Sequence, residues 1–403
     1  MSGFKSSPPF PSGESPEPRA KCKVCGEHAY LFDVVDFNKY CSDHPYSFGL
    51  AGIPVYYYRC YTCGLVYSKF FDKWSSEDFR RFVYNAEYIK VDGAYVDQRP
   101  TQMADKLAPY FLERKGVSIL DYGGGNGRLT ERLREHGICN VESYDPFSNP
   151  IKPNQKFDII TCFEVIEHSP FPVDTMIEMK SYLHDTGIIL LGTGLQPEDI
   201  VHRRASWWYI APRNGHITIF DETSLARLAS TCGLIFYPGS EVHCFSFVDV
   251  NPKMNLAVLG VGRPFRCHVL YAPDQLIGSQ LSGCWHDVES GEAENYRWTS
   301  SRALSWQVPL VSGSRIRIEI PFLMEIEPRF AETSVIMIGA QALPTRVVVG
   351  DDFGPRLLVY ADIDYVSTTE VILWTPEPIR PSELHGTNDA RPLGIAIPLK
   401  GAT

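Results

Sequence analysis

Hydrophobic residues change their spacing along this chain, and each spacing predicts a different kind of structure. Residues 101–116 place Leu107, Phe111 and Leu112 on one face of a helix that ends at Gly116. Between 117 and 262, continuous apolar runs alternate with amphipathic segments that end at glycines. We expect strands at 117–120, 158–162 and 187–194, and helices at 128–136, 173–186 and 221–232. This alternation predicts a Rossmann-like α/β core, a parallel sheet with helices on both faces.

Beyond about residue 266 the hydrophobic spacing becomes period two. The clearest run, RIRIEI, alternates Ile316, Ile318 and Ile320 with charged residues. Further short runs at 334–338, 346–350, 356–360, 370–374 and 393–397 are separated by Gly, Pro and Asp turns. This pattern predicts an antiparallel, jelly-roll-like β-sandwich.

The chain is therefore predicted to be multidomain. Residues 1–19 hold five Pro and five Ser with almost nothing to bury, which indicates a disordered tail. Residues 20–75 are rich in Cys and Tyr and are expected to form a small zinc-ribbon-like domain, followed by a helical linker at 76–115. The α/β core is expected at 116–265 and the all-β sandwich at 266–403.

The composition limits the partners and the location of the protein. A net charge of −10 argues against a protein that binds nucleic acid, which needs a basic face. No apolar run approaches the ~18 residues of a membrane-spanning helix, so we expect no transmembrane segment. The eleven cysteines comprise two tight pairs and seven scattered residues rather than a disulfide framework, which favours a reducing, cytoplasmic setting.

A glycine-rich turn, ILDYGGGNG, follows the first strand of the predicted core. It lacks the sixth-position glycine of dinucleotide sites and the Gly-Lys-Ser/Thr ending of phosphate loops. It fits the pattern D-x-G-x-G-x-G, formed by Asp121, Gly123, Gly125 and Gly127. A carboxylate here repels a pyrophosphate but attracts an ammonium, and the glycines let a ligand approach the backbone closely. S-adenosylmethionine carries an amino group and a sulfonium but no phosphate, so it is the favoured ligand.

A second acidic residue, Asp145, follows the next expected strand, where its carboxylate can accept both ribose hydroxyls. Together, ILDYGGGNG, SYDP and FDIITCFEVIEH resemble the class I S-adenosylmethionine-dependent methyltransferases, in the branch of small-molecule and sugar enzymes. The resemblance covers residues 117–262. It implies that Asp145 binds the ribose, and that Phe163 and Glu164 line the methionine end of the cofactor.

The stretch FEVIEHS follows the strand at 158–162 and holds the candidate catalytic residues. If it is helical, Glu164, Glu167 and His168 share one face. One hypothesis makes His168 the general base, tuned by Glu167. A second makes E-x-x-E-H a divalent-metal site, because some ubiquinone-pathway and RNA-tail methyltransferases resemble this stretch and use it so. A third gives the cluster only a role in shaping the pocket.

Residues 206–220, SWWYIAPRNGHITIF, lie where the resembling family places its substrate cover. Trp207, Trp208 and Tyr209 are candidates for stacking on a sugar, and His216 is a second candidate base. Ordinary packing between cover and core is the alternative for the three aromatic rings. The H-x-x-x-F spacing that starts at His216 also loosely resembles deoxysugar C-methyltransferases.

Two C-x-x-C-G sequences supply four candidate metal ligands: Cys22, Cys25, Cys60 and Cys63. Each turn lets two thiolates bind one ion, so the two turns predict a tetrahedral structural Zn²⁺ site. The long insert between the pairs offers Cys41 and His44 as alternative ligands. Zinc knuckles before a class I core also resemble the sugar methyltransferase branch, whose C-methylating members have an α/β rather than an all-β C-terminal domain.

Four of the seven tryptophans fall in the C-terminal region: Trp285, Trp298, Trp306 and Trp374. The stretches GCWHDVESGEAENYRWT and DARPLGIAI resemble β-sandwich modules attached to bacterial polysaccharide glycosyltransferases. This resemblance implies a module that docks a glycan or a neighbouring glycan-assembly enzyme. The alternative is that the tryptophans fill the sandwich core.

These observations predict a cytoplasmic S-adenosylmethionine-dependent methyltransferase that methylates a sugar hydroxyl in the assembly of a bacterial surface polysaccharide, of the O-antigen or capsule type. Its acceptor is expected to be a sugar, a sugar nucleotide or a glycan. One alternative is C-methylation of a nucleotide-linked keto-sugar. Another is a glycan-binding or scaffolding protein whose methyltransferase core is unused.

Overall fold

The computed structural model describes residues 17–60, 62–247, 250, 255–269, 285, 288–290, 295–300, 303–308, 310–325, 331, 333–350, 353–363, 370–385, 387–391 and 393–398. The chain divides into two compact units, Met1–Gly262 and Arg263–Thr403. Most of the predicted tail, 1–19, lies outside the described residues, and Arg19 begins strand β1. Within the described ranges, no helix has both the length and the apolar character needed to cross a membrane.

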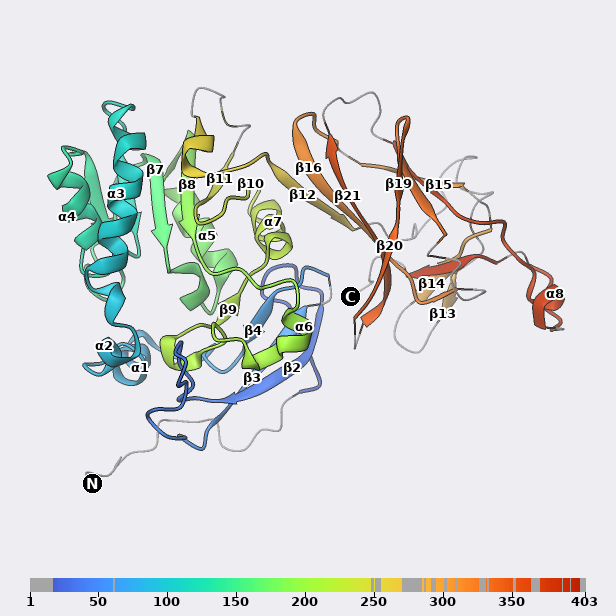
Figure 1. The fold of residues 1–403 in the computed structure, drawn as a ribbon, viewed down its shortest axis with the longest axis horizontal. Coiled ribbons are helices and arrows are strands. Elements are labelled where there is room, and N and C mark those ends of the chain that lie inside the picture. Colours follow the sequence, from blue (N-terminus) through green and yellow to red (C-terminus); the bar gives the residue numbers. More distant parts are fainter. Residues whose placement is uncertain are drawn as a thin grey trace. The chain divides into compact units, whose positions relative to one another are not determined.

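The first unit contains a six-stranded mixed sheet in the order β10-β11-β8-β7-β5-β6 (Figure 1). Its strands are Ile235–Tyr237 (β10), His243–Ser246 (β11), Leu183–Gly192 (β8), Phe157–Phe163 (β7), Ile119–Tyr122 (β5) and Val141–Tyr144 (β6). Strand β5 is parallel to β6 and β7, and β7 is parallel to β8. Strand β11 is antiparallel to β8 and β10. The predicted parallel sheet is therefore present, with an antiparallel hairpin as an addition.

Helices cover both faces of this sheet. Figure 1 shows α3 (Gln98–Leu112) and α4 (Arg128–Glu135) on one side, and α5 (Pro172–Ser181) and α7 (Glu222–Thr231) on the other. Parallel crossovers are right-handed, so connections that run in opposite directions from β5 and β7 place their helices on opposite faces. The helix predicted at 173–186 is too long, because Leu183 is buried and already pairs with Phe157 as the first residue of β8.

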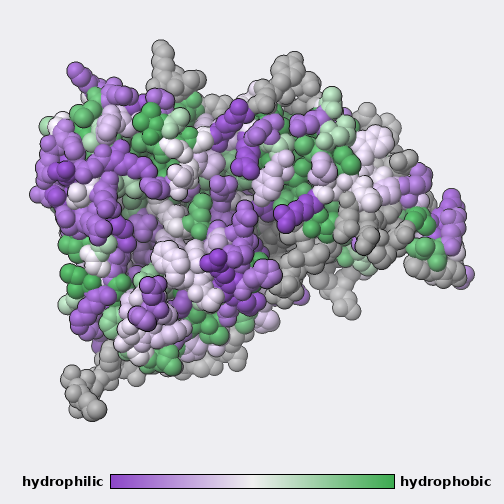
Figure 2. Space-filling model, viewed as in Figure 1, coloured by the Kyte–Doolittle hydropathy of each residue, from purple (hydrophilic) through white to green (hydrophobic). Residues whose placement is uncertain are grey.

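Helix α4 shows how its sequence positions it. Leu129 and Leu133 are buried on its inner face, while Arg128 on its outer face contacts Asp97, Glu131 and Glu135 at 2.6, 2.9 and 3.1 Å. Figure 2 shows the hydrophilic surface over α3 and α4 that results. Exposed ion pairs contribute little to stability, so the apolar stripe is what holds this helix on the sheet.

The Cys-rich region forms a second sheet in the first unit, in the order β1-β2-β3-β4-β9. Its strands are Arg19–Lys21, His28–Asp36, Pro54–Cys60, Val66–Ser68 and Thr218–Ile219, all antiparallel. Because β9 comes from the predicted cover, residues 20–75 and the cover share one apolar core, which includes Tyr57, Trp207 and Ile217. The Cys-rich region is thus a layer of the first unit and not a compact unit of its own. Short helices α1 (Ser76–Phe82), α2 (Tyr88–Val91) and α6 (Ile200–Arg203) complete this layer.

The second unit is built from strands in its described part, apart from the short helix α8 (Pro381–His385). Its sheets have the orders β20-β21-β16-β12, β13-β14-β23-β17 and β15-β22-β18-β19. These strands are Phe265–Val269 (β12), Glu289–Ser290 (β13), Asn295–Trp298 (β14), Ala303–Gln307 (β15), Ser314–Pro321 (β16), Met324–Glu325 (β17), Val335–Ile338 (β18), Gln341–Pro344 (β19), Arg346–Gly350 (β20), Phe353–Ile363 (β21), Glu370–Trp374 (β22) and Ile395–Pro398 (β23). Strand β12 is parallel to β16, so this region is not purely antiparallel as predicted.

The RIRIEI run lies in β16, and its three isoleucines are fully buried as predicted. Its polar face is not solvated throughout, because Glu319 is also buried and pairs with Arg317 at 2.5 Å. Of the four tryptophans, Trp285 and Trp298 are buried in apolar clusters, whereas the side chain of Trp374 is 45% exposed. Trp306 is partly buried and packs against the cluster that contains Trp285, so core filling accounts for three of them.

Candidate active site

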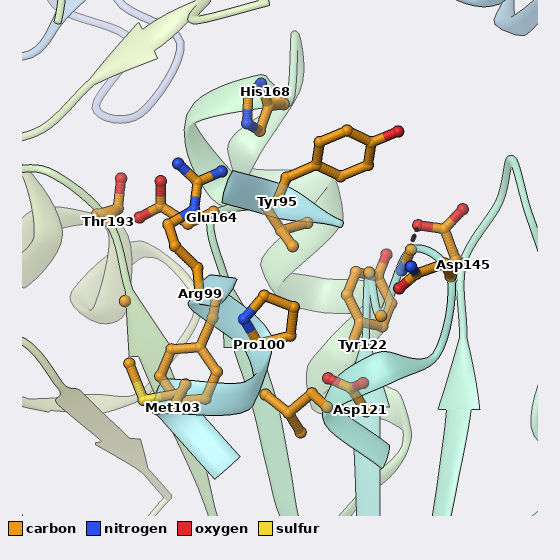
Figure 3. Close-up of a pocket in the computed structure, with 18 of the residues that line it drawn as sticks. Tyr95, Arg99, Pro100, Met103, Asp121, Tyr122, Asp145, Glu164, His168 and Thr193 are labelled. Atoms are coloured by element: carbon orange, nitrogen blue, oxygen red, sulfur yellow. Dashed lines mark hydrogen bonds between the residues drawn. The ribbon is translucent and has the colours of Figure 1, made fainter. Parts of the chain in front are cut away.

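A pocket of about 1170 Å³ lies at the carboxyl ends of the parallel strands in the first unit (Figure 3). Asp121, Asp145, Phe163 and Thr193 line it where β5, β6, β7 and β8 end. Parallel strands bring their carboxyl ends to one edge of a sheet, so these residues meet although they span more than seventy positions in the sequence.

The glycine turn after β5 forms one end of this pocket. Gly123, Gly125 and Gly127 have left-handed φ values of 74°, 55° and 80°, which glycine adopts without steric cost. The sequence pattern passed over Gly124, but a Cβ there would lie 2.3 Å from Ser143 Oγ and 2.5 Å from Asp121 Oδ2. The turn therefore requires a fourth glycine, for close packing rather than for its φ angle.

The Asp121 carboxylate is buried beneath the turn. The hydroxyl of Thr161 donates to its Oδ1 at 3.1 Å and that of Thr130 to its Oδ2 at 3.2 Å. Burial raises the pKa of Asp121 to about 6, although the two hydroxyls oppose that rise. At neutral pH the carboxylate is therefore mainly ionised and provides a negative group for an ammonium ligand.

The Asp145 carboxylate is oriented by backbone groups on both sides. Its Oδ2 accepts the Gly125 N–H at 3.2 Å, the dashed line in Figure 3, and its Oδ1 accepts the N–H groups of Phe147 and Ser148, each at 2.8 Å. These three N–H groups occupy both lone-pair positions of Oδ1 and one of Oδ2, so Oδ2 can accept one further hydrogen bond. Asp145 thus presents an acceptor to the pocket that a ribose hydroxyl could use.

Phe163 and Glu164 line the pocket at the end of β7. Glu164 has a φ of 55°, which is uncommon for a residue with a side chain, and its N–H donates to the Gly192 carbonyl at 2.9 Å. The pKa of Glu164 is raised to about 7. Burial is the main cause, the nearby Glu167 adds to the rise, and Arg99 opposes it. In Figure 3 the carboxylate of Glu164 lies beside the guanidinium of Arg99.

The expectation that residues 164–168 form one helix is wrong. The left-handed backbone at Glu164 redirects the chain, and only Ile166–His168 form a single 3₁₀ turn. As a result Glu164 and His168 line the pocket, whereas Glu167 is fully buried outside its wall. The three side chains do not share one face.

His168 has one ring nitrogen committed to the backbone. Its Nδ1 lies 3.0 Å from the Gly215 carbonyl oxygen, which can only accept a hydrogen bond. The proton of neutral His168 is therefore on Nδ1, and Nε2 carries a free lone pair. Burial lowers the pKa of His168, which keeps the imidazole neutral near pH 7. His168 thus has the protonation state that a general base needs.

His216 and Glu167 lie behind His168. The His216 Nδ1 donates to the Tyr209 carbonyl at 2.8 Å, and its ring centre lies 5.1 Å from that of His168. His216 is buried and does not line the pocket, so the structure does not place it where an acceptor could reach it as a base. Burial lowers the pKa of His216 strongly.

Glu167, His168 and His216 can together hold a metal ion. One ligand atom from each lies within 4.8 Å of the others. Both imidazoles direct Nδ1 to a backbone carbonyl, the outer contact usual for metal-bound histidines, and the buried Glu167 Oε2 has no hydrogen-bond partner. The donor set therefore fits a divalent cation, with His216 in place of the predicted Glu164.

The predicted sugar-stacking residues do not line the pocket. Trp207 and Tyr209 are buried in the cover, and Trp208 is 54% exposed but lies outside the pocket wall. The Tyr209 hydroxyl accepts the Gly194 N–H at 2.9 Å and donates to Glu167 Oε1 at 2.7 Å, so its ring serves the packing between cover and core. The stacking hypothesis needs other aromatic residues.

Several aromatic residues and a cation that no sequence motif indicates do line the pocket. Tyr84, Tyr95, Arg99 and Phe147 all line the pocket. Figure 3 shows Tyr95 across its middle and Arg99 next to Glu164. They follow no motif, because they come from short turns and the first turn of α3. The one available signal was Arg99, a cation just ahead of the helix expected at 101–116.

The four cysteines of the C-x-x-C pairs converge in the first unit. The Sγ atoms of Cys22 and Cys63 lie 3.6 Å apart, those of Cys25 and Cys60 3.5 Å, and those of Cys25 and Cys63 3.7 Å. Tetrahedral zinc with Zn–S bonds of ~2.3 Å places sulfur atoms about 3.8 Å apart, so the cluster fits that ion. Cys41 is not in this cluster; its Sγ lies 3.7 Å from His216 Nδ1, and His44 is exposed, so the alternative ligand set is wrong.

Comparisons with known proteins bear on the α/β core. Residues 95–235 match the family model described as a methyltransferase domain. The ubiquinone biosynthesis O-methyltransferase of Actinobacillus pleuropneumoniae is 25% identical over 130 residues, which cover 24% of this chain and 55% of that protein. The tRNA U34 carboxymethyltransferase of Campylobacter lari is 28% identical over 112 residues, which cover 22% of this chain and 38% of that protein. The chain thus spans about half the length, or less, of the curated relatives it matches.

Among solved structures, magnesium protoporphyrin IX methyltransferase from Synechocystis PCC 6803 with bound SAM is similar at 12% identity, covering 42% of this chain and 94% of that chain with a TM-score of 0.30. The strand order and the family match concern the same segment of this chain. The α/β part of the first unit accordingly has the class I fold of S-adenosylmethionine-dependent methyltransferases.

Proposed function

We propose that this protein transfers a methyl group from S-adenosylmethionine to a hydroxyl oxygen. The observation that carries the proposal is that one pocket holds both the acidic residues after β5 and β6 and the imidazole of His168. The named relatives include O-methyltransferases, which favours oxygen as the acceptor atom. C-methylation of a keto-sugar and an unused, scaffolding core are the alternatives.

The pocket offers partners for the ribose, the ammonium and the carboxylate of the cofactor. Asp145 would accept a ribose hydroxyl, and Asp121, which lines the same pocket, would attract the ammonium. Arg99, which lines the same pocket beside Glu164, would bind the methionine carboxylate. When bound, the cofactor supplies the methyl group: the new O–C bond forms as the S–C bond breaks, and the sulfonium becomes a neutral thioether.

His168 would accept the proton of the reacting hydroxyl on Nε2. The hydrogen bond from Nδ1 to Gly215 holds the ring in that tautomer. Burial opposes the positive charge that the ring then acquires, and the nearby Glu164 carboxylate favours it. If a divalent cation occupies Glu167, His168 and His216, His168 is a ligand instead, and the metal would lower the pKa of the acceptor hydroxyl.

We also propose that the four clustered cysteines hold a structural Zn²⁺, since their sulfur separations match a tetrahedral site. For the acceptor we propose a sugar. Phe79, Tyr84 and Phe147 supply the aromatic surface that the cover does not. The relatives named above lend no support to polysaccharide assembly as the pathway, or to a glycan-docking role for the second unit.

The first experiment is calorimetric titration of S-adenosylmethionine into the full-length protein. We expect binding in the wild type and at least about tenfold weaker binding in Asp145→Ala, because a hydrogen bond from the ribose to a charged group is lost. Asp185→Ala, a variant of an acid whose side chain is 96% exposed, is the control and should bind normally. Absence of cofactor binding in the wild type would refute the function.

The second experiment tests the role of His168. If His168 is the general base, the His168→Asn variant should retain cofactor affinity, lose turnover at neutral pH and regain part of that turnover at alkaline pH. As a metal ligand, His168→Asn and His216→Asn should both lose stoichiometric Mn²⁺ binding, measured by electron paramagnetic resonance. Full turnover in His168→Asn would exclude both roles.

A further inference from the structure

A row of aromatic rings extends from His168 along the pocket. The ring centre of Tyr84 lies 6.1 Å from that of His168 and 5.3 Å from that of Phe147, which in turn lies 6.4 Å from that of Phe79. All four residues line the pocket. We call Phe79, Tyr84 and Phe147 the aromatic wall. It provides an apolar surface of mutually tilted rings that begins at the proposed base.

The pocket is large enough for two molecules. Its volume of about 1170 Å³ exceeds the ~300–1,000 Å³ that usually holds one small ligand. Asp121, the glycine turn and Asp145 account for the cofactor. The aromatic wall is then available for the acceptor.

One cation, Arg80, stands at the outer end of this wall. Its guanidinium carbon lies 5.7 Å from the ring centre of Phe147, and its Nη2 lies 3.5 Å from the Phe147 carbonyl oxygen. Its acidic neighbour Glu77 is 3.8 Å away and 79% exposed, a pairing worth little in water. Arg80 therefore has hydrogen-bond donors to spare for a ligand.

The other two pocket-lining Lys and Arg residues in the described part of the chain have other partners, and Arg99 is already assigned to the carboxylate of the cofactor. Arg99 pairs with Asp92 at 2.5 Å, and Lys106 pairs with Glu241. Of the acids next to the wall, Asp145 is assigned to the cofactor and Glu77 is 79% exposed, so Arg80 is the charge that remains for the acceptor, and it is positive. The wall therefore favours an acceptor that carries an oxyanion next to a ring.

We propose that Arg80 binds a phosphate group on the acceptor, with the acceptor's sugar ring on the aromatic wall and its reacting hydroxyl at His168. The substrate class is then a sugar phosphate or a nucleotide-linked sugar rather than a free sugar. A carboxylate shares the fork geometry that a guanidinium recognises, but a phosphate carries more charge, which favours it at a solvent-exposed rim. This inference rests on the proposed function.

The test is titration of four probes into the full-length protein saturated with S-adenosylhomocysteine: glucose 1-phosphate, inorganic phosphate, glucuronate and glucose. We expect both phosphates to bind more tightly than glucuronate, and glucose to bind most weakly. Arg80→Gln should weaken both phosphates at least about tenfold, since a charged hydrogen bond is lost. The wall variant Tyr84→Ala should weaken glucose 1-phosphate but not inorganic phosphate.

Arg81→Gln is the matched control. Arg81 lies on the same helix, is equally exposed and packs over Phe82 at 5.0 Å, but it does not line the pocket. The inference is overturned if the phosphates fail to bind, if Arg80→Gln behaves like Arg81→Gln, or if glucuronate binds as tightly as phosphate. Failure of S-adenosylhomocysteine itself to bind would instead refute the proposed function.

Discussion

The Tyr209 hydroxyl donates a 2.7 Å hydrogen bond to the Glu167 carboxylate, and both residues are buried. This contact joins the cover, which follows β8, to the turn that follows β7. It also fixes the carboxylate beside His168 and His216. The position of the proposed base therefore depends on a residue that does not touch the pocket.

Tyr209→Phe should destabilise the protein by about 1–3 kcal/mol, because Glu167 and the Gly194 N–H both lose their partner in a buried setting. Thermal unfolding measures the loss. Tyr46→Phe is the control, since Tyr46 is exposed and should tolerate the change. Equal melting temperatures for the two variants would contradict a structural role for the Tyr209–Glu167 bond.

Gly124→Ala should distort the cofactor site, although the φ angle of Gly124 is not left-handed and would accept a side chain. A Cβ there meets Ser143 Oγ and Asp121 Oδ2 well inside contact distance, so the turn must shift at a cost of roughly 1–3 kcal/mol. We expect weaker S-adenosylmethionine binding by calorimetry and a lower melting temperature. Gly93→Ala, where a Cβ meets no atom within 4 Å, should change neither. Unaltered cofactor affinity in Gly124→Ala would show that the turn can yield.

His243 in β11 should make stability depend on pH. Burial lowers its pKa to about 4, so the unfolded chain binds a proton between about pH 6.5 and 4 that the folded chain does not. The contribution of His243 to the free energy of unfolding is therefore complete above pH 6.5 and is lost as the pH falls. Between pH 7 and 5 the free energy of unfolding should fall by about 2 kcal/mol for this reason.

Chemical denaturation of the wild type and of His243→Asn at both pH values tests this. Asparagine keeps an acceptor for the Gly239 N–H, which bonds to His243 Nδ1 at 3.1 Å, but does not titrate. The difference in stability between the two proteins should shrink by about 2 kcal/mol at pH 5. A difference that stays constant with pH would contradict the assignment.

Removal of metal from the cysteine cluster should loosen the cover but spare the cofactor site. The Gln196 side chain bonds to the carbonyls of Gly64 and Ile219 at 3.0 and 2.7 Å, and β4 pairs with β9, so the second knuckle is tied to the cover. Asp121 and Asp145 are held by β5, β6 and the glycine turn instead.

We expect Cys22→Ser, or chelation of the wild type, to increase hydrogen exchange in residues 200–220 while S-adenosylmethionine affinity stays within about threefold, a change smaller than the loss of one hydrogen bond. Cys139→Ser, at an exposed cysteine outside the cluster, is the control. Faster exchange confined to residues 20–75 would show that the cover does not depend on the metal.

The parts of the site that were predictable share a physical origin. A glycine turn, a carboxylate at a strand end and a C-x-x-C-G knuckle are set by backbone geometry over a few residues, so their spacing in the sequence carries the information. The alternation of buried strands and amphipathic helices likewise depends on local periodicity, and it specified the order of elements in the core.

The sequence by itself thus determined the class of the core, the glycine turn after Asp121 and the two C-x-x-C turns that supply the candidate metal ligands. Only the tertiary structure decided which side chains face the pocket. A left-handed residue at Glu164 turned Glu167 inward, β9 drew the cover onto the Cys-rich sheet and buried Trp207, and α1 brought Arg80 beside Phe147. These arrangements arise from contacts between segments far apart in the chain, where burial of apolar surface outweighs local preference, and no short pattern records them.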